Sequence, residues 1–210
     1  MKKIFTIILC CLLFVGVTGG SFALAKHFDE NPPTSVGDNS SKQDDDNGKT
    51  DTKTVQIWEL CTDSSDLAVG DQIVLVASSN ERALSLTQNT NNRAATKIVK
   101  EDDSITINDD VQIITLEEGV VDNTFAFNVG DGYLYAPSSA SNHLRTKTAI
   151  DANGSWSITI DEGAVANIVA QGESTINVLQ YNSNNHIFSC YTSTQEAILI
   201  YKLVEREIEL

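Results

Sequence analysis

Three segments of the chain carry side chains suited to binding a polar ligand. In each, a polar turn ends in asparagine, which is followed by a basic or imidazole residue, and two of the segments also contain tyrosine. An asparagine amide both donates and accepts hydrogen bonds, and a tyrosine ring can stack on a sugar. The candidate ligand-binding residues are Asn92, Arg93, Tyr135, Asn142, His143, Tyr181, Asn185 and His186.

The same residues also have a structural interpretation, which stays open beside the first. Asparagine tolerates left-handed backbone and bonds its own turn, so it often serves only as a turn former. A catalytic histidine needs a dedicated partner, whereas His143 and His186 occupy one repeated position that holds Arg93 in the first segment. We therefore expect no catalytic histidine.

No motif of a known catalytic site occurs in the sequence. G-x-S-x-G, H-E-x-x-H and G-x-x-x-x-G-K are all missing. The acid pairs Glu117-Glu118 and Asp161-Glu162 each precede a glycine and read as turns. We expect a protein that is not an enzyme and needs no cofactor.

Two of the four cysteines, Cys61 and Cys190, lie outside the N-terminal apolar segment. A disulfide between them would close a loop of roughly 130 residues. The alternative is a pair of buried free thiols, which pack as small apolar groups. Together with three scattered histidines they do not have the spacing of a zinc site, so no metal is expected.

The three candidate segments are copies of one repeat. Each has leucine at its second position, then the polar turn, then an apolar residue and a hydroxyl. A second element, "IITLEEGVVDNTFAF" at 113–127, matches "SITIDEGAVANIVA" at 157–170, and residues 57–77 fill the first copy in degenerate form. The aligned segments are "ALSLTQNTNNRAAT" (83–96), "YLYAPSSASNHLRT" (133–146) and "VLQYNSNNHIFS" (178–189).

The elements that carry this repeat are β-strands. Short runs of β-branched and aromatic residues, such as "DQIVLVAS" and "SWSITI", alternate with clusters of Gly, Asn, Asp and Ser, and no window has a sustained helical apolar face. Three units of roughly 45–50 residues, each with four strands, predict an all-β fold of the β-trefoil type. A two-sheet β-sandwich with internal duplication is the alternative.

The segments "GYLYA" and "NHLRT" resemble the cap hairpins of fibroblast growth factors and ricin-type lectins, although the Q-x-W signature of those lectins is not present at the expected strand. The stretches "GDQIVLVAS" and "IFSCYTSTQEAILIYKL" look like an uncharacterised module that recurs in secreted bacterial proteins, and the similarity covers residues 56–203. The resemblance implies an extracellular accessory domain and supplies no catalytic residues.

The N-terminus predicts export. Lys2 and Lys3 precede an apolar run that ends in an A-x-A-like site at Ala23 and Ala25, so residues 1–25 read as a cleaved signal peptide. If uncleaved, residues 4–25 are long enough to anchor the chain in a membrane. Residues 26–53 read as a disordered polar linker, 54–204 as the repeat domain and 205–210 as a tail.

The net charge of the chain limits the classes of ligand that it can bind. The chain has a formal net charge of −15, which repels phosphate backbones and argues against nucleic acid. We therefore predict a secreted or surface-tethered, non-catalytic binding module whose repeated hairpins bind a glycan or another cell-surface polymer. A structural or protein-interaction domain, of adhesion or inhibitor type, is the alternative.

Overall fold

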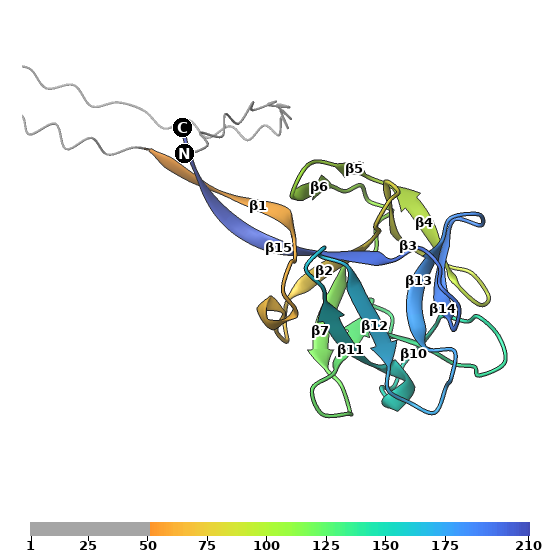
Figure 1. The fold of residues 1–210 in the computed structure, drawn as a ribbon. Helices are drawn as coiled ribbons and strands as arrows, with labels where there is room; N and C mark the ends of the chain where they lie inside the picture. Colours follow the sequence, from red (N-terminus) through yellow and green to blue (C-terminus); the bar gives the residue numbers. More distant parts are fainter. Residues whose placement is uncertain (1–50) are drawn as a thin grey trace, which may run out of the picture. The chain divides into compact units, whose positions relative to one another are not determined.

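The computed structural model describes residues 51–210. The predicted signal peptide and nearly all of the predicted linker lie outside the described residues. Within 51–210, no helix is long and apolar enough to cross a membrane. The described residues form fifteen strands and two short 3-10 helices, so the predicted all-β class is confirmed (Figure 1).

The elements follow the turn-separated apolar runs of the sequence. The strands are β1 (Thr52–Leu60), β2 (Gln72–Ala77), β3 (Arg82–Gln88), β4 (Arg93–Lys97), β5 (Val99–Lys100), β6 (Ser104–Thr106), β7 (Ile114–Glu118), β8 (Phe125–Asn128), β9 (Tyr133–Tyr135), β10 (Arg145–Lys147), β11 (Ser155–Ile160), β12 (Ala166–Ala170), β13 (Val178–Asn182), β14 (Ile187–Tyr191) and β15 (Ile198–Glu209). The 3-10 helices are η1 (Ser64–Asp66) and η2 (Ala152–Gly154).

Six of the strands close into a barrel. Antiparallel pairing runs from β2 to β7, β8, β11, β12 and β15, and β15 pairs back with β2. Because this path returns to its first strand, the barrel has no free edge, which a pair of open sheets would leave. The β-sandwich alternative is therefore excluded.

Three hairpins complete the fold. The hairpin β3–β4 lies in the chain between barrel strands β2 and β7, β9–β10 lies between β8 and β11, and β13–β14 lies between β12 and β15. Each unit thus consists of a barrel strand, a cap hairpin and a second barrel strand. This is the β-trefoil arrangement that the three-fold repeat predicts.

One part of the repeat assignment is wrong. Residues 57–77 were expected to supply a barrel hairpin, yet β1 pairs along its whole length with Tyr201–Glu209 of β15 instead. The two strands form a long antiparallel ribbon that runs away from the barrel (Figure 1). Strand β1 begins at Thr52 and β15 ends at Glu209, so the ribbon extends past both ends of the segment 54–204 and includes residues predicted as a tail.

The apolar side chains form two clusters. The main cluster contains Trp156, which is fully buried and stacks on Phe127 with 5.5 Å between ring centroids. The second cluster contains Trp58 from β1, Ile98 from the residue before β5, and Ile105 from β6. Trp58 is therefore a core residue of the second cluster and not of the barrel.

Both cysteines in the described residues are buried free thiols. Cys61 and Cys190 thus follow the second of the two alternatives, and no disulfide joins them. Burial raises the pKa of each thiol, most strongly at Cys190, and the Cys61 thiol donates a hydrogen bond to the Asp63 carbonyl at 3.2 Å. Both sulfurs are neutral packing groups at neutral pH.

Candidate functional site

The three cap hairpins meet one another. Strand β14 pairs with β4, where Phe188 lies opposite Arg93. The Leu144 amide donates to the Asn91 carbonyl at 2.8 Å and joins the second hairpin to the first. The Ser189 hydroxyl donates to the Asn142 carbonyl at 2.7 Å and joins the third hairpin to the second.

The register of each hairpin shows which residues are true counterparts. The repeated leucines lie opposite Ala95, Thr146 and Cys190 in their hairpins. Counting back two positions from these partners gives three buried side chains at the point where the hairpins converge. They are Arg93, Leu144 and Phe188.

The aligned asparagines and their basic neighbours are therefore not structural equivalents. Aligning the segments on these Asn–basic pairs displaces the second hairpin by one residue and the third by two relative to the strand register. By register, the counterpart of Arg93 is Leu144 and not His143, although the sequence pattern pairs Arg93 with the histidines.

Two of the predicted ligand-binding residues are buried. Arg93 is only 2% exposed, and its guanidinium donates to the Leu86 carbonyl, the Gln112 side chain and the Thr146 hydroxyl at 2.8–3.0 Å. Tyr181 is fully buried in the main cluster. Neither can contact a ligand on the surface, so this part of the prediction is wrong.

Three other candidates bond within their own turns. The Asn92 side chain accepts a hydrogen bond from Asn89 at 2.8 Å. The Asn185 backbone N–H donates to the Asn182 side-chain oxygen at 3.0 Å, and His186, which has a φ of 53°, bonds the Tyr181 hydroxyl through Nδ1 at 2.9 Å. These contacts match the turn-forming interpretation.

The second hairpin keeps its polar and aromatic side chains accessible. Tyr133 and Tyr135 flank the buried Leu134 on β9, so both rings lie on the opposite face. Across the hairpin, Lys147 lies opposite Tyr133 and Arg145 lies opposite Tyr135. All four side chains are partly exposed. We call these four residues the second-hairpin face.

The matching positions of the other two hairpins differ in character. In the first, the counterparts of the tyrosines are Ala83 and Ser85, which are buried. In the third they are Val178 and Gln180. Among the cap hairpins, only the second therefore presents aromatic rings on this face.

The Glu117 carboxylate and the Asn128 side-chain amide lie beside Tyr133, at one end of the second-hairpin face. Glu117 on β7 accepts hydrogen bonds from the Asn128 side chain at 2.5 Å and from the Tyr133 hydroxyl at 2.8 Å. These bonds hold the pKa of Glu117 below its ordinary value and raise the pKa of Tyr133. Asn128 and Tyr133 also line a shallow pocket of about 270 Å³, together with Asp131.

The other end is basic. The Lys147 ammonium lies 4.4 Å from the centroid of the Tyr135 ring and pairs with Asp151. The Arg145 guanidinium donates from Nε to the Asn91 side-chain oxygen at 3.0 Å. Partial burial, and then the charge of Arg145, lower the pKa of the neighbouring His143.

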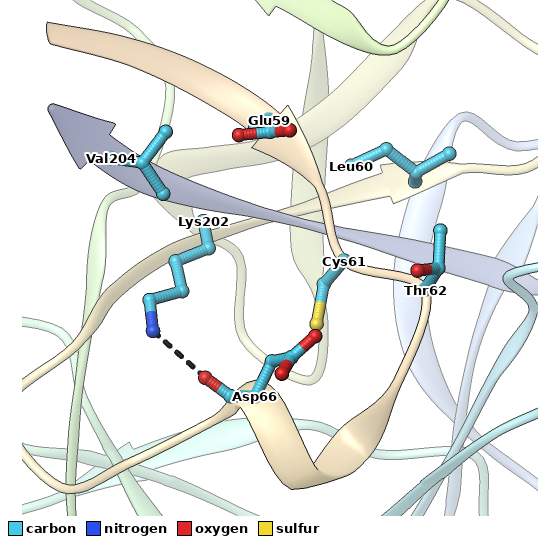
Figure 2. Close-up of a pocket in the computed structure, with 7 residues that line it drawn as sticks. All are labelled: Glu59, Leu60, Cys61, Thr62, Asp66, Lys202 and Val204. Atoms are coloured by element: carbon cyan, nitrogen blue, oxygen red, sulfur yellow. Dashed lines mark hydrogen bonds between the residues drawn. The ribbon is translucent and has the colours of Figure 1, made fainter. Parts of the chain in front are cut away.

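A second hollow, of about 350 Å³, lies at the base of the ribbon beside Cys61 (Figure 2). Two of its charged side chains, Lys202 and Glu59, already have partners within the protein. The Lys202 ammonium donates to the Asp66 carbonyl and pairs with Asp71, both at 2.8 Å, and Glu59 pairs with Arg206. With a neutral thiol, and with Lys202 and Glu59 already paired, this hollow has fewer groups free for polar recognition than the second-hairpin face.

The sequence pattern identified Tyr135, Asn142 and His143 on this hairpin but missed four neighbours. The alternation in "YLY" and "RTK" could have placed Tyr133, Arg145 and Lys147 on one face. Nothing local identifies Glu117, which reaches Tyr133 only because β7 and β9 both flank β8. Within 51–210, no group of three or more His, Cys, Asp or Glu side chains could hold a metal.

Comparisons with known proteins add little to these observations. No protein-family model and no curated protein matches the chain. A structure described as "BEL beta-trefoil apo crystal form 3" matches over 66% of this chain and 96% of its own, with 15% identity and a TM-score of 0.48. A GH43 beta 1,3-galactosidase matches over 70% of this chain, with 13% identity and the same TM-score.

The chain spans 29% of that galactosidase. At these scores the likenesses carry no argument about function, and the fold assignment rests on the closed path of strand pairing.

Proposed function

We propose that the protein is a non-catalytic glycan-binding module and that the second-hairpin face is its binding site. The observation that carries the proposal is the pair of partly exposed rings, Tyr133 and Tyr135, beside an ordered carboxylate and amide. A tyrosine offers an apolar face to sugar C–H groups and a hydroxyl at its rim. Carboxylate and amide oxygens accept hydrogen bonds from sugar hydroxyls.

The contacts within the site favour binding through preorganisation. Glu117 and Asn128 orient each other, and Glu117 also holds the Tyr133 hydroxyl, so less conformational freedom is lost when a sugar docks. The ring of Tyr135 is likewise held, by the Lys147 ammonium above it. The proposal assigns one site to each chain, because the other cap hairpins lack these residues.

Export completes the proposal. The apolar run after Lys2 and Lys3, followed by small residues at Ala23 and Ala25, supports a secreted or surface-tethered chain. In that setting the module would meet cell-surface glycans, and the polar segment at 26–53 would tether it.

The proposal is tested by probing a glycan array with the purified protein and with the Tyr133→Ala/Tyr135→Ala variant. We expect wild type to bind a defined set of glycans and the variant to lose at least about tenfold in affinity. Gln180→Ala is the matched control, because Gln180 is the register counterpart of Tyr135 in the third hairpin.

Two results would contradict the proposal. One is an unchanged glycan profile in the double variant while the protein remains folded by circular dichroism. The other is no glycan binding together with specific capture of one protein partner, which would favour the protein-interaction alternative.

A further inference from the structure

The second-hairpin face has opposite charges at its two ends. Glu117 and Asp131 lie at the Tyr133 end, and Asp131 lines the same shallow pocket as Tyr133. At the Tyr135 end, Arg145 is the cross-strand partner of Tyr135, and the Lys147 ammonium lies over the Tyr135 ring. Two residues along a strand span about 6.6–6.8 Å, so the two rings match neighbouring sugars of a chain better than one sugar.

The two cations at the Tyr135 end differ in how they are neutralised. Lys147 pairs with the Asp151 carboxylate, so its charge is locally balanced. Arg145 donates from Nε and one terminal nitrogen to a single neutral oxygen, that of Asn91. Among residues 51–210, Arg145 takes part in no salt bridge.

Arg145 is therefore a positively charged side chain that has no carboxylate partner among the described residues. The Nη1 nitrogen of Arg145 has no hydrogen-bond partner among the described residues, and its side chain is partly exposed. The Asn91 contact fixes the guanidinium plane, which prepares it to bind an anion.

We propose that the bound glycan is acidic and that the carboxylate of a uronic acid docks on Arg145, with the neighbouring sugar on Tyr133. This inference rests on the proposed glycan-binding function and names its ligand class. Charge-assisted bonds from a guanidinium to a carboxylate are stronger than bonds between neutral groups. The carboxylates at the Tyr133 end repel a second acidic group there, so the face selects the direction of the glycan chain.

The inference is tested with matched disaccharides that differ only in one carboxylate. Galacturonosyl-galactose against galactobiose of the same linkage, and cellobiouronic acid against cellobiose, are titrated by isothermal calorimetry into the purified protein. We expect at least one acidic member to bind about ten- to a hundredfold more tightly than its neutral match, and the preference to shrink at high salt. Arg145→Gln should abolish the preference and Arg145→Lys should retain part of it.

Lys53→Gln is the charge-matched control, because Lys53 is exposed on the ribbon and its loss changes the net charge by the same amount. Equal binding of acidic and neutral members, or a preference that survives Arg145→Gln, overturns the inference and leaves the proposed function standing. Binding of no saccharide, acidic or neutral, by wild type here and on the array overturns both.

Discussion

At the scale of single residues, Arg93 is the least expected feature. It takes the place that Leu144 and Phe188 hold in the other hairpins, at the point where the three caps meet. Burial lowers the pKa of its guanidinium, and its Nε has no hydrogen-bond partner among the described residues. Three hydrogen bonds to neutral oxygens offset part of the cost of burying this charge.

Replacing Arg93 tests whether the guanidinium or the volume of the side chain matters. Arg93→Ala should destabilise the fold by about 2–4 kcal/mol, because it leaves a cavity and unpaired Gln112 and Thr146 groups. Arg93→Met keeps most of the volume and should cost clearly less. Urea unfolding measures both, and equal losses in the two variants would show that the hydrogen bonds dominate.

Glu117 gives a residue-scale prediction about pH. Its pKa is lowered in the folded protein by the bonds from Asn128 and Tyr133, so it contributes stability that is present above its unfolded pKa. That contribution is lost as the pH falls through the lower, folded pKa. Wild type should therefore lose more stability than Glu117→Gln between pH 6 and pH 3, as measured by urea unfolding at each pH. Equal losses of stability in wild type and in Glu117→Gln would contradict this role of Glu117.

At the scale of elements, the second cap hairpin positions the candidate site. The Trp156 indole donates to the Leu134 carbonyl at 3.1 Å and ties β9 to the barrel. Gly132 precedes β9 with a φ of 150°, and a Cβ there would lie 2.4 Å from the Lys147 carbonyl of the paired strand. The glycine thus permits the close approach of the two strands that carry the tyrosines and the cations.

Two glycines in this turn make a matched pair. Gly130 has a φ of 94° and open space around its Cβ position, so Gly130→Ala should cost about 1–2 kcal/mol from backbone strain alone. Gly132→Ala adds a backbone clash, should cost more and should weaken glycan binding. Thermal unfolding and the array measure both effects. Gly132→Ala with wild-type stability would refute the role of the close approach.

The elements also show what the sequence could and could not predict. Alternation and turn residues predicted the strands and the three-unit plan, because both are local properties of the chain. The hairpin register was not predictable, because the Asn–basic pairs at Asn92, Asn142 and Asn185 lie at different positions relative to the strand register. The contact between Glu117 and Tyr133 depends on strand order across β8, which no short pattern records.

At the scale of the whole molecule, the closed barrel and the ribbon make different contributions. The barrel encloses the main cluster, whereas the second cluster lies beneath β1 and the β5–β6 segment. The chain has two tryptophans, of which Trp156 lies in the main cluster and Trp58 in the second cluster. This division allows a test of how much the ribbon and the second cluster contribute to the stability of the β-trefoil.

Trp156→Ala should destabilise the protein by about 3–5 kcal/mol, since it removes a fully buried ring from the barrel. Trp58→Ala should cost less and should loosen the ribbon first, because Trp58 retains 9% exposure in the smaller cluster. Tryptophan fluorescence during urea unfolding follows the remaining residue in each variant. A larger loss for Trp58→Ala would mean that the ribbon, and not the barrel, holds the fold together.

The central claim is that the second-hairpin face binds a glycan. The most direct test is an amide chemical-shift titration of the labelled protein with the glycan that binds best on the array. We predict that the largest shifts fall at residues 133–135 and 145–147, and that Tyr133→Ala/Tyr135→Ala removes them. Shifts centred on the first or third hairpin, or on the hollow beside Cys61, would contradict it.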